Sequence, residues 1–325
     1  LGAYDYVVKP IQMNGLEVTI KNAIETIRLR KEVCILQEKH LKENLPCFIG
    51  KSNTVQDMME FIEVVAKSPD TPVFIMGETG TGKELIARSI HYRSPNFGGN
   101  FVTVNCAAIP KELIESEIFG YEKGAFTGAK RQGCIGKFEQ ANKGTLFLDE
   151  VHTMGLATQM KLLRVLEERR VTRGGGMTSV QLDLRIITAT SASLLEEVAE
   201  GRFLDALYYR LNVVKLLIPS LKNRKEDIPY LVPGFIEQMN KRLDRRVKGI
   251  TPPVEKLFQD YDWPGNIREL KNCIESACVF CVDAWIKPEH LKGTSVFENK
   301  KCPDNIDTSL TIEEMTEKLI KSAYE

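Results

Sequence analysis

Hydrophobic residues in the middle of the chain occur in short runs separated by longer stretches with helical spacing. The stretch 160–166 is an example of the second kind, with apolar residues three or four positions apart. Short apolar runs are typical of buried parallel strands, and their alternation with amphipathic helices is typical of α/β folds. The pattern predicts a doubly wound parallel sheet within 48–222, with a ligand at the carboxyl ends of its strands. The predicted strands are 73–76, 101–104, 145–148 and 184–189.

The pattern changes after residue 222. Strand-like runs stop, and helical periods continue through 223–292, interrupted by Pro252-Pro253 and Trp263-Pro264-Gly265. This region predicts a small helical subdomain. Residues 293–325 begin with a polar, turn-rich linker and end in one further helix that starts near Thr311.

The first 47 residues predict a strand followed by helix. Residues 2–8 form a short apolar run that ends at Lys9-Pro10, and a helical stripe follows at Leu16, Ile20, Ala23, Ile24 and Ile27. Residues 28–46 are strongly charged with a thin apolar stripe, which predicts a linker helix that Pro46 ends. Such a helix either pairs with a copy of itself or stays solvated.

Composition excludes several classes of protein. Lys plus Arg number 44 and Asp plus Glu number 44, so the chain has no overall basic footprint for nucleic acid. No apolar run approaches the ~18 residues of a membrane span. The chain begins at Leu1 and lacks the features of a signal peptide, so we expect an internal fragment of a cytoplasmic protein without membrane partners.

The eight cysteines do not follow a zinc-site spacing. Cys278 and Cys281 form C-x-x-C near Cys273, but no second pair of ligands follows. We expect buried free thiols in a reducing compartment.

A glycine-rich segment between the strand 73–76 and a helix predicts a phosphate-binding loop. It matches G-x-x-x-x-G-K-[ST] except at its last position, which is Glu84. Glycines let successive backbone N–H groups point at phosphate oxygens, and Lys83 adds a charge for the outer phosphates. The alternative is an ordinary strand-to-helix turn. The predicted nucleotide-binding residues are Gly77, Glu78, Thr79, Gly80, Thr81, Gly82, Lys83 and Glu84.

Two carboxylates follow the apolar strand 145–148. A magnesium ion that bridges phosphates needs a nearby carboxylate, and a water that attacks the last phosphate needs a second one to orient and deprotonate it. We assign Asp149 to magnesium and Glu150 to the water.

Several longer motifs together resemble one family. The hexapeptide G-A-F-T-G-A at 124–129 resembles that of the NtrC-like, sigma-54-dependent bacterial transcription activators, which are AAA+ P-loop NTPases with a helical lid. The segments 104–110, 115–123, 144–150 and 263–270 also match that family and come in its order. The resemblance covers 48–292.

The resemblance implies roles for further residues. ATP with Mg²⁺ would bind near Ile49 and Gly50 at its base, and Arg268 would sense the γ-phosphate. Asn105 would pair with Glu150 and switch its orientation, and Arg210 would reach the nucleotide of a neighbouring subunit in a hexameric ring. A surface loop would contact the sigma-54 RNA polymerase holoenzyme through Gly124, Ala125, Phe126, Thr127, Gly128 and Ala129. Phe126 is an apolar anchor of the kind that dominates small interfaces.

Three positions depart from the family pattern or its usual residues. Leu204 stands where the family has another arginine, and Ser191 replaces an asparagine of the first sensor; we still place Ser191 among the nucleotide-binding residues. A shorter hydroxyl can still form a hydrogen bond, with a different reach. His152 follows the carboxylate pair, and we expect a surface histidine there. Glutamate at position 84 is usual in the family, so waters and Asp149 would coordinate more of the metal.

Both ends of the chain resemble parts of longer regulators. Residues 1–30 resemble the end of a response-regulator receiver domain, in which Lys9 and Tyr6 match the strand-end lysine and the switch aromatic; the alternative is an ordinary strand–helix unit. Residues 31–47 would be a linker helix that holds an inactive dimer. Within 293–325, the segment from Thr308 resembles the first helix of a Fis-like helix-turn-helix. Enhancer DNA would therefore be bound only by the complete protein, and a sensor histidine kinase would be its partner.

The sequence thus predicts a ring-forming ATPase that remodels sigma-54 RNA polymerase within a two-component phosphorelay. Two alternatives stay open. Leu204 and Ser191 favour a nucleotide-binding regulator with impaired hydrolysis, and the AAA+ pattern alone also fits a remodeller of another target.

Overall fold

The computed structural model describes residues 13–44, 52–125 and 132–298. By internal contacts the chain divides into two compact units, 1–235 with 262–270 and 236–261 with 271–325. The predicted helical subdomain began at residue 223. Residues 223–235 and 262–270 of that prediction belong to the α/β unit in the structure.

A five-stranded parallel sheet forms the centre of the first unit. The strand order is β2-β5-β8-β1-β9, and every neighbouring pair is parallel. Strands β1, β2, β5 and β8 confirm the predicted runs to within one residue, and β9 was not predicted. The strands are β1 (Val73–Met76), β2 (Phe101–Asn105), β5 (Thr145–Asp149), β8 (Arg185–Thr190) and β9 (Val214–Leu217).

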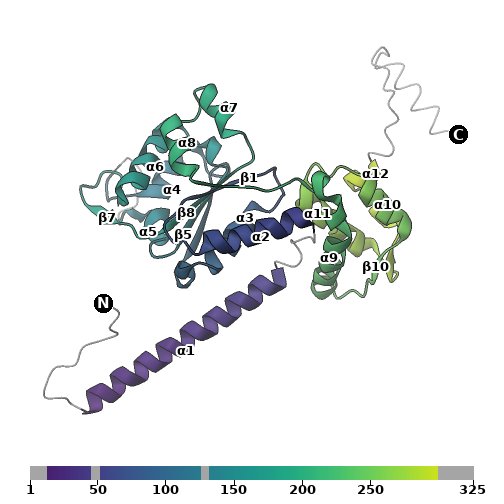
Figure 1. Cartoon of the computed structure of the whole chain (residues 1–325), viewed down its shortest axis with the longest axis horizontal. Helices are drawn as coiled ribbons and strands as arrows, with labels where there is room; N and C mark the ends of the chain where they lie inside the picture. The colour runs from purple at the N-terminus through teal and green to yellow at the C-terminus, as the bar shows by residue number, and fades with distance from the viewer. Residues whose placement is uncertain (1–12, 45–51, 126–131, 299–325) are drawn as a thin grey trace. The chain divides into compact units, whose positions relative to one another are not determined.

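Helices cover both faces of this sheet, as the doubly wound pattern predicts (Figure 1). On one face, α2 (Asn53–Ala66) and α3 (Lys83–Tyr92) pack together. On the other face, a continuous core joins the strands to α4 (Lys111–Phe119), α6 (Leu156–Glu168), α7 (Leu194–Ala199) and α8 (Asp205–Leu211). All six residues of β8 are buried, as expected for a central strand of a parallel sheet.

Two short hairpins extend the α/β unit. The strands β3 (Gly120–Tyr121) and β4 (Cys134–Ile135) are antiparallel and flank the 124–129 segment. The strands β6 (Arg170–Thr172) and β7 (Ser179–Gln181) form the second hairpin. Short helical turns complete this unit: η1 (Pro95–Gly98), α5 (Lys137–Gln140), η2 (Val151–Thr153) and η3 (Leu221–Asp227).

The second unit is mainly helical, as predicted. It contains the second half of α9 (Ile228–Leu243), most of α11 (Asn266–Phe280) and all of α10 (Pro252–Asp260). Pro252 and Pro253 begin α10 and do not break it, because proline is tolerated in the first turn of a helix. The remaining elements are β10 (Gly249–Ile250), β11 (Trp285–Ile286), η4 (Pro288–Leu291) and α12 (Ser295–Glu298).

The N-terminal region contains one helix, α1 (Met13–Asn44), of 32 residues. It runs without a break across the boundary at 30/31 that separates the predicted receiver remnant from the predicted linker. Leu29, Val33 and Leu36 of the predicted apolar stripe are exposed in the single chain. The strand expected at 2–8, with Tyr6 and Lys9, lies outside the described residues, as does the C-terminal helix expected from Thr311. Every described helix is too short or too polar to span a bilayer.

Candidate functional site

The predicted phosphate loop connects β1 to α3. Gly80 and Gly82 have φ values of +81° and +92°, a left-handed conformation that glycine adopts without strain. Gly82 is the N-cap of α3, and the first N–H groups of a helix have no acceptor within it. Thr81 is fully buried, and its hydroxyl donates to the Glu78 carbonyl at 2.7 Å. The turn therefore offers a braced set of donors and a helix N-terminus, which fits a chain of phosphates.

Lys83 turns back toward the carboxyl ends of the strands. Its side chain is 6% exposed, and Nζ donates to the Gly77 carbonyl at 2.9 Å and to Glu150 Oε1 at 3.2 Å. Glu84 instead lies on the exposed side of α3, where it accepts two hydrogen bonds from Arg88 at 2.7 Å and 3.0 Å. Lys83 therefore joins the loop to the predicted carboxylate pair.

Asp149 ends β5, and Glu150 follows it next to this lysine. Burial raises the pKa of Asp149, the charge of Glu150 adds to that effect, and Lys83 opposes it. The pKa of Glu150 is lowered: burial would raise it, but hydrogen bonds from Ser191 and the charge of Lys83 outweigh burial. Glu150 is therefore ionised at neutral pH. Mg²⁺ prefers oxygen ligands, so two carboxylates beside the phosphate loop form a donor set that fits this ion.

Ser191 contacts Glu150. Its backbone N–H and its hydroxyl donate to Glu150 Oε2 at 2.9 Å and 2.8 Å. The structure thus brings Ser191 to the carboxylate, and its assignment to nucleotide binding stays a prediction.

His152 borders the same carboxylate, which corrects the expectation of a surface histidine. Its side chain is 21% exposed, and Nδ1 lies 3.5 Å from Glu150 Oε2 and 2.9 Å from the hydroxyl of Thr190. The reason is that His152 lies in η2, the tight turn that directly follows β5. The sequence could have indicated this contact, because His152 is only two residues after Glu150.

Asn105 ends the strand next to β5, where it pairs in register with Asp149. Its side-chain oxygen accepts from the backbone N–H groups of Ala107 and Ala108 at 3.0 Å and 3.2 Å. These hydrogen bonds lie within the turn that follows Asn105, and its pairing with Glu150 stays a prediction.

The segment 262–270 brings a further residue to the phosphate loop, which the sequence did not single out. Asn266 is fully buried, and its Nδ2 donates to Glu78 Oε2 at 3.0 Å and to the Thr79 carbonyl at 3.1 Å. Its Oδ1 accepts from the Leu221 N–H at 2.7 Å. The available signal was its place in the motif 263–270, two residues before Arg268.

Arg268 is anchored by its backbone. Its N–H donates to the Gly80 carbonyl at 3.2 Å, while the residue itself is exposed. A Cβ atom at Gly80 would come within 2.2 Å of the Gly265 carbonyl oxygen, so only glycine fits this close approach. The structure therefore places Arg268 beside the phosphate loop, and its γ-phosphate role stays a prediction.

The predicted trans-acting region lies around α8. Arg210 is exposed and donates to the Leu166 carbonyl at 3.0 Å. Leu204, which replaces a family arginine, is half-buried and packs against the hydrophobic core. Position 204 thus contributes packing and no positive charge, and the nearby Arg202 is ion-paired with Glu197 and Glu200.

The base of the predicted partner-binding loop is tied to the β6–β7 hairpin. Glu122 N–H donates to the Gly174 carbonyl at 2.9 Å, and Arg173 pairs with Glu122 at 3.2 Å and with Glu139 at 2.7 Å. A groove of about 580 Å³ adjoins this base, between α4 and α6. Gly124 and Ala125 are described here, whereas Phe126, Thr127, Gly128 and Ala129, together with Ile49 and Gly50, lie outside the described residues.

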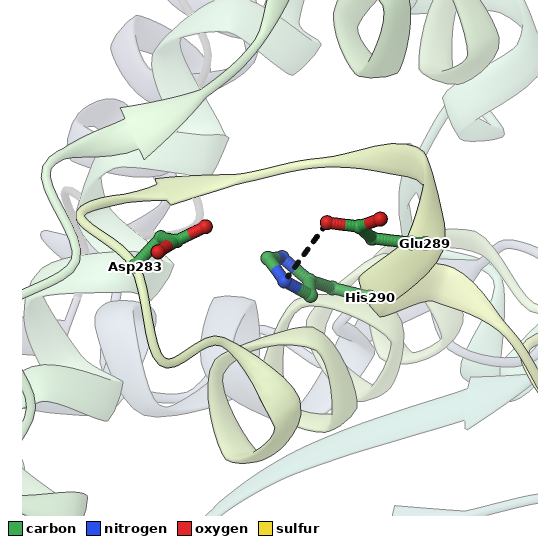
Figure 2. Close-up of side chains that lie close together, drawn as sticks. All are labelled: Asp283, Glu289 and His290. Carbon is green, nitrogen blue, oxygen red and sulfur yellow. Dashed lines mark ion pairs between the residues drawn. The ribbon is translucent and has the colours of Figure 1, made fainter.

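A separate cluster of metal-type ligands lies in the second unit. Figure 2 shows Asp283, Glu289 and His290, whose ligand atoms all lie within 4.8 Å of one another. The ammonium of Lys287 lies 2.6 Å from Asp283 Oδ2 and 3.9 Å from Glu289 Oε1, and the Lys287 N–H donates to His290 Nδ1 at 3.1 Å. Because the Lys287 ammonium already pairs with both carboxylates, we interpret the cluster as an exposed ion-pair network.

The three cysteines that the structure describes in the second unit are buried thiols, as predicted. Cys273, Cys278 and Cys281 are buried and form no disulfide, and burial raises the pKa of Cys278 to about 11. No metal-type cluster of the described residues includes them.

Comparison with known proteins identifies the family. Residues 48–217 match the model of the "Sigma-54 interaction domain", and residues 222–306 match that of the "AAA+ ATPase lid domain". The chain belongs to the sigma-54 interaction domain family. The AAA+ P-loop NTPase fold with a lid, predicted from the sequence, is confirmed.

Relatives and solved structures agree with this assignment. The chain is 44% identical to the regulatory protein AtoC of Escherichia coli K12 over 86% of this chain and 60% of AtoC. It is 43% identical to the transcriptional regulatory protein ZraR of the same strain over 89% of this chain and 64% of ZraR. The chain therefore spans less than two thirds of these relatives. Crystal structures of NtrX from Brucella abortus in complex with ADP and with ATP have TM-scores of 0.74 and 0.72. Their identities are 34% and 33%, and each covers 98% of this chain and 70% of the NtrX chain.

Proposed function

We propose that this chain is the ATPase core of a sigma-54-dependent transcriptional activator. The proposal rests on three groups that lie together at the carboxyl ends of β1 and β5. They are the loop 77–83, the ammonium of Lys83, and the carboxylates of Asp149 and Glu150. Family membership and the NtrX complexes with ADP and ATP support ATP as the nucleotide.

In this proposal each residue has one role in hydrolysis. The loop N–H groups and Lys83 bind the β- and γ-phosphates, and Asp149 with waters holds Mg²⁺, which neutralises charge on the phosphates when bound. Glu150 accepts a proton from the attacking water. Arg268 contacts the γ-phosphate, and Arg210 of a neighbouring subunit stabilises the charge that develops on it.

In this proposal, ATP hydrolysis drives a conformational change that remodels the closed complex of sigma-54 RNA polymerase. We propose that a ring of subunits, a hexamer, moves the segment 124–129 against sigma-54 in the cytoplasm. The ties between Glu122, Arg173 and Gly174 support this, because they couple the base of the loop to the hairpin that follows α6.

Control of the core would come from the parts at its ends. A receiver domain phosphorylated by a sensor histidine kinase would release an inactive dimer held through the linker helix, and enhancer DNA would be bound by the complete protein. The exposed apolar residues of α1 support the dimer. Sedimentation of the chain as a monomer at every concentration would contradict this step.

A steady-state ATPase assay tests the enzymatic proposal. Glu150→Gln removes the base while nearly keeping shape, so turnover should fall at least about 100-fold, within the usual range for a general base. The matched control is Glu167→Gln, an exposed glutamate of α6, which should keep the parent rate. Absence of turnover in the parent chain would favour the second candidate, a non-hydrolysing nucleotide-binding regulator, for which Leu204 is the motivating observation.

A binding assay separates sigma-54 from another target of the remodeller. The chain should retain sigma-54 in a pull-down with ADP and a γ-phosphate mimic, and Phe126→Ala should weaken retention because it removes the proposed apolar anchor. The control is Phe61→Ala on α2, which removes a 40% exposed aromatic from a different element. Retention unaffected by Phe126→Ala would contradict the loop assignment.

A further inference from the structure

Glu84 adds a negative charge to the end of α3 that is proposed to bind phosphates. It directly follows Lys83 and lies in the first turn of the helix. A carboxylate in this turn is favourable for the helix dipole, but it repels a phosphate bound at the same helix end. Its charge reaches the predicted metal ligand: burial and the charge of Glu150 raise the pKa of Asp149, and the charge of Glu84 adds to that rise. A nucleotide at the loop would therefore meet a third carboxylate besides Asp149 and Glu150.

Arg88 pairs with this carboxylate one turn further along α3. Its Nη2 and Nε donate to the same oxygen, Glu84 Oε1, at 2.7 Å and 3.0 Å. Residues at i and i+4 are neighbours on a helix surface, so the pair needs no distortion of the backbone. The side chains of Arg88 and Glu84 are 33% and 51% exposed, and exposed pairs of this kind contribute little to stability. The main effect of the pair is therefore on the charge beside the loop.

Phe101 holds the guanidinium of Arg88 from a second direction. The Arg88 Cζ lies 4.7 Å from the centroid of the Phe101 ring, within the range of a cation–π contact. Phe101 is the first residue of β2, and its ring stacks on that of Phe147 in β5 with centroids 6.1 Å apart. Arg88 is thus fixed to the sheet as well as to its own helix, and this second contact keeps its charge at Glu84.

We propose that Arg88 is a positioning residue for nucleotide binding: it holds and neutralises Glu84, so that this carboxylate repels the phosphates less. The inference rests on the proposed function, in which ATP binds at the loop 77–83. It explains how this loop accepts phosphates although the last position of its motif is an acid and not a hydroxyl residue. Arg88 acts through Glu84 and does not contact the nucleotide.

Calorimetric titration of the full chain with ADP, without magnesium and at low salt, tests this role. Arg88→Gln leaves Glu84 uncompensated, so ADP affinity should fall about three- to tenfold, as expected for one charge that acts on several phosphate charges near the protein surface. The loss should shrink at about 0.5 M salt, because salt screens exposed charges. Arg88→Lys keeps the charge and should keep ADP affinity within about twofold of the parent.

A substitution at Glu84 makes the test specific. Glu84→Gln removes the repelling charge, so Arg88→Gln made in that background should change ADP affinity by less than about twofold. The matched control is Arg164→Gln, at an exposed arginine of α6, which should bind ADP like the parent. If Arg88→Gln does not fold, Arg88→Met removes the same charge, keeps an apolar contact for Phe101, and should show the same loss.

The outcomes distinguish this inference from the proposed function. Unchanged ADP affinity in Arg88→Gln, while Lys83→Met weakens ADP binding, overturns the inference and leaves the function intact. An equal loss from Arg88→Gln in the parent and in the Glu84→Gln background also overturns it, because Arg88 would then act on the nucleotide without Glu84. If the parent chain does not bind ADP, the proposed function itself fails.

Discussion

The ammonium of Lys83 and the carboxylate of Glu150 lie 3.2 Å apart, 67 residues apart in the chain, with side chains only 6% and 15% exposed. The proposed phosphate-binding cation and the candidate base are therefore one electrostatic unit. In the proposed function, phosphates compete with Glu150 for Lys83, so nucleotide binding and the freedom of the base would be coupled.

Variants of Lys83 and Glu150 should separate nucleotide binding from ATP hydrolysis. Lys83→Met removes the charge that faces the phosphates, so affinity for ADP should fall at least about tenfold, the loss of a hydrogen bond between charged groups. Glu150→Gln should leave ADP affinity within about threefold and abolish turnover. Calorimetric titration with ADP measures the first effect, and Lys67→Met, an exposed lysine after α2, is the control. Equal ADP affinity in Lys83→Met and parent would show that the loop binds without this lysine.

Asn266 gives a prediction that concerns both stability and binding. Asn266→Ala leaves the buried Leu221 N–H without its recorded acceptor and removes two contacts to Glu78 and Thr79. The free energy of unfolding should fall by about 2 to 3 kcal/mol, and ADP affinity should fall with it because the loop loses its brace. Urea denaturation measures the first quantity, and Asn223→Ala, at an exposed asparagine of η3, is the control. Loss of stability with unchanged ADP affinity would confine Asn266 to a structural role.

The sheet could be predicted because its signal is local. Strands β1, β5 and β8 are largely buried, β2 is partly exposed, and each of the four was found to within one residue. Strand β9 was missed although β2, at the opposite edge of the sheet, was found. Lys215 interrupts the apolar run of β9, and both Lys215 and Leu217 are exposed, so this four-residue strand has a weak pattern.

The site could be predicted only where its residues are close in sequence to a motif. The loop 77–84 and the pair Asp149-Glu150 are local motifs, and they come together because parallel strands end at one edge. The contact of Ser191 with Glu150 spans 41 residues, and that of Asn266 with Glu78 spans 188. Such contacts depend on side-chain reach and turn geometry in the folded chain, which no periodicity encodes.

Cys106 supplies a chemical prediction beside the site. Burial, and then the charge of Asp149, raises the pKa of its thiol to about 12. Because the thiolate is the reactive form, iodoacetamide at pH 8 should leave Cys106 unmodified in the native chain. Cys134, which is half-buried in β4, should react. Mass spectrometry with and without urea measures both, and alkylation of Cys106 as fast as Cys134 in the native chain would contradict the burial argument.

His91 makes stability depend on pH. It is 1% exposed in α3, and its Nδ1 lies 2.8 Å from the hydroxyl of Thr145. Burial, and then the charges of Arg88 and Arg185, lowers its pKa from 6.5 to about 4. The unfolded chain therefore binds a proton between pH 6.5 and pH 4 that the folded chain does not, so stability falls as pH falls through this window.

The size of this effect follows from the two pKa values. Between pH 7 and pH 5 the free energy of unfolding should fall by about 2 kcal/mol through His91 alone. Urea denaturation at both pH values measures the change, and His91→Gln should reduce it by that amount, because glutamine keeps a polar group near Thr145 and has no proton to gain. His290→Gln, in the second unit, is the control histidine variant. An equal pH dependence in the parent and His91→Gln would contradict the prediction, because it would mean that folded His91 takes up its proton as readily as unfolded His91. We expect the opposite, since a charged imidazole in this buried position, close to the charges of two arginines, is costly.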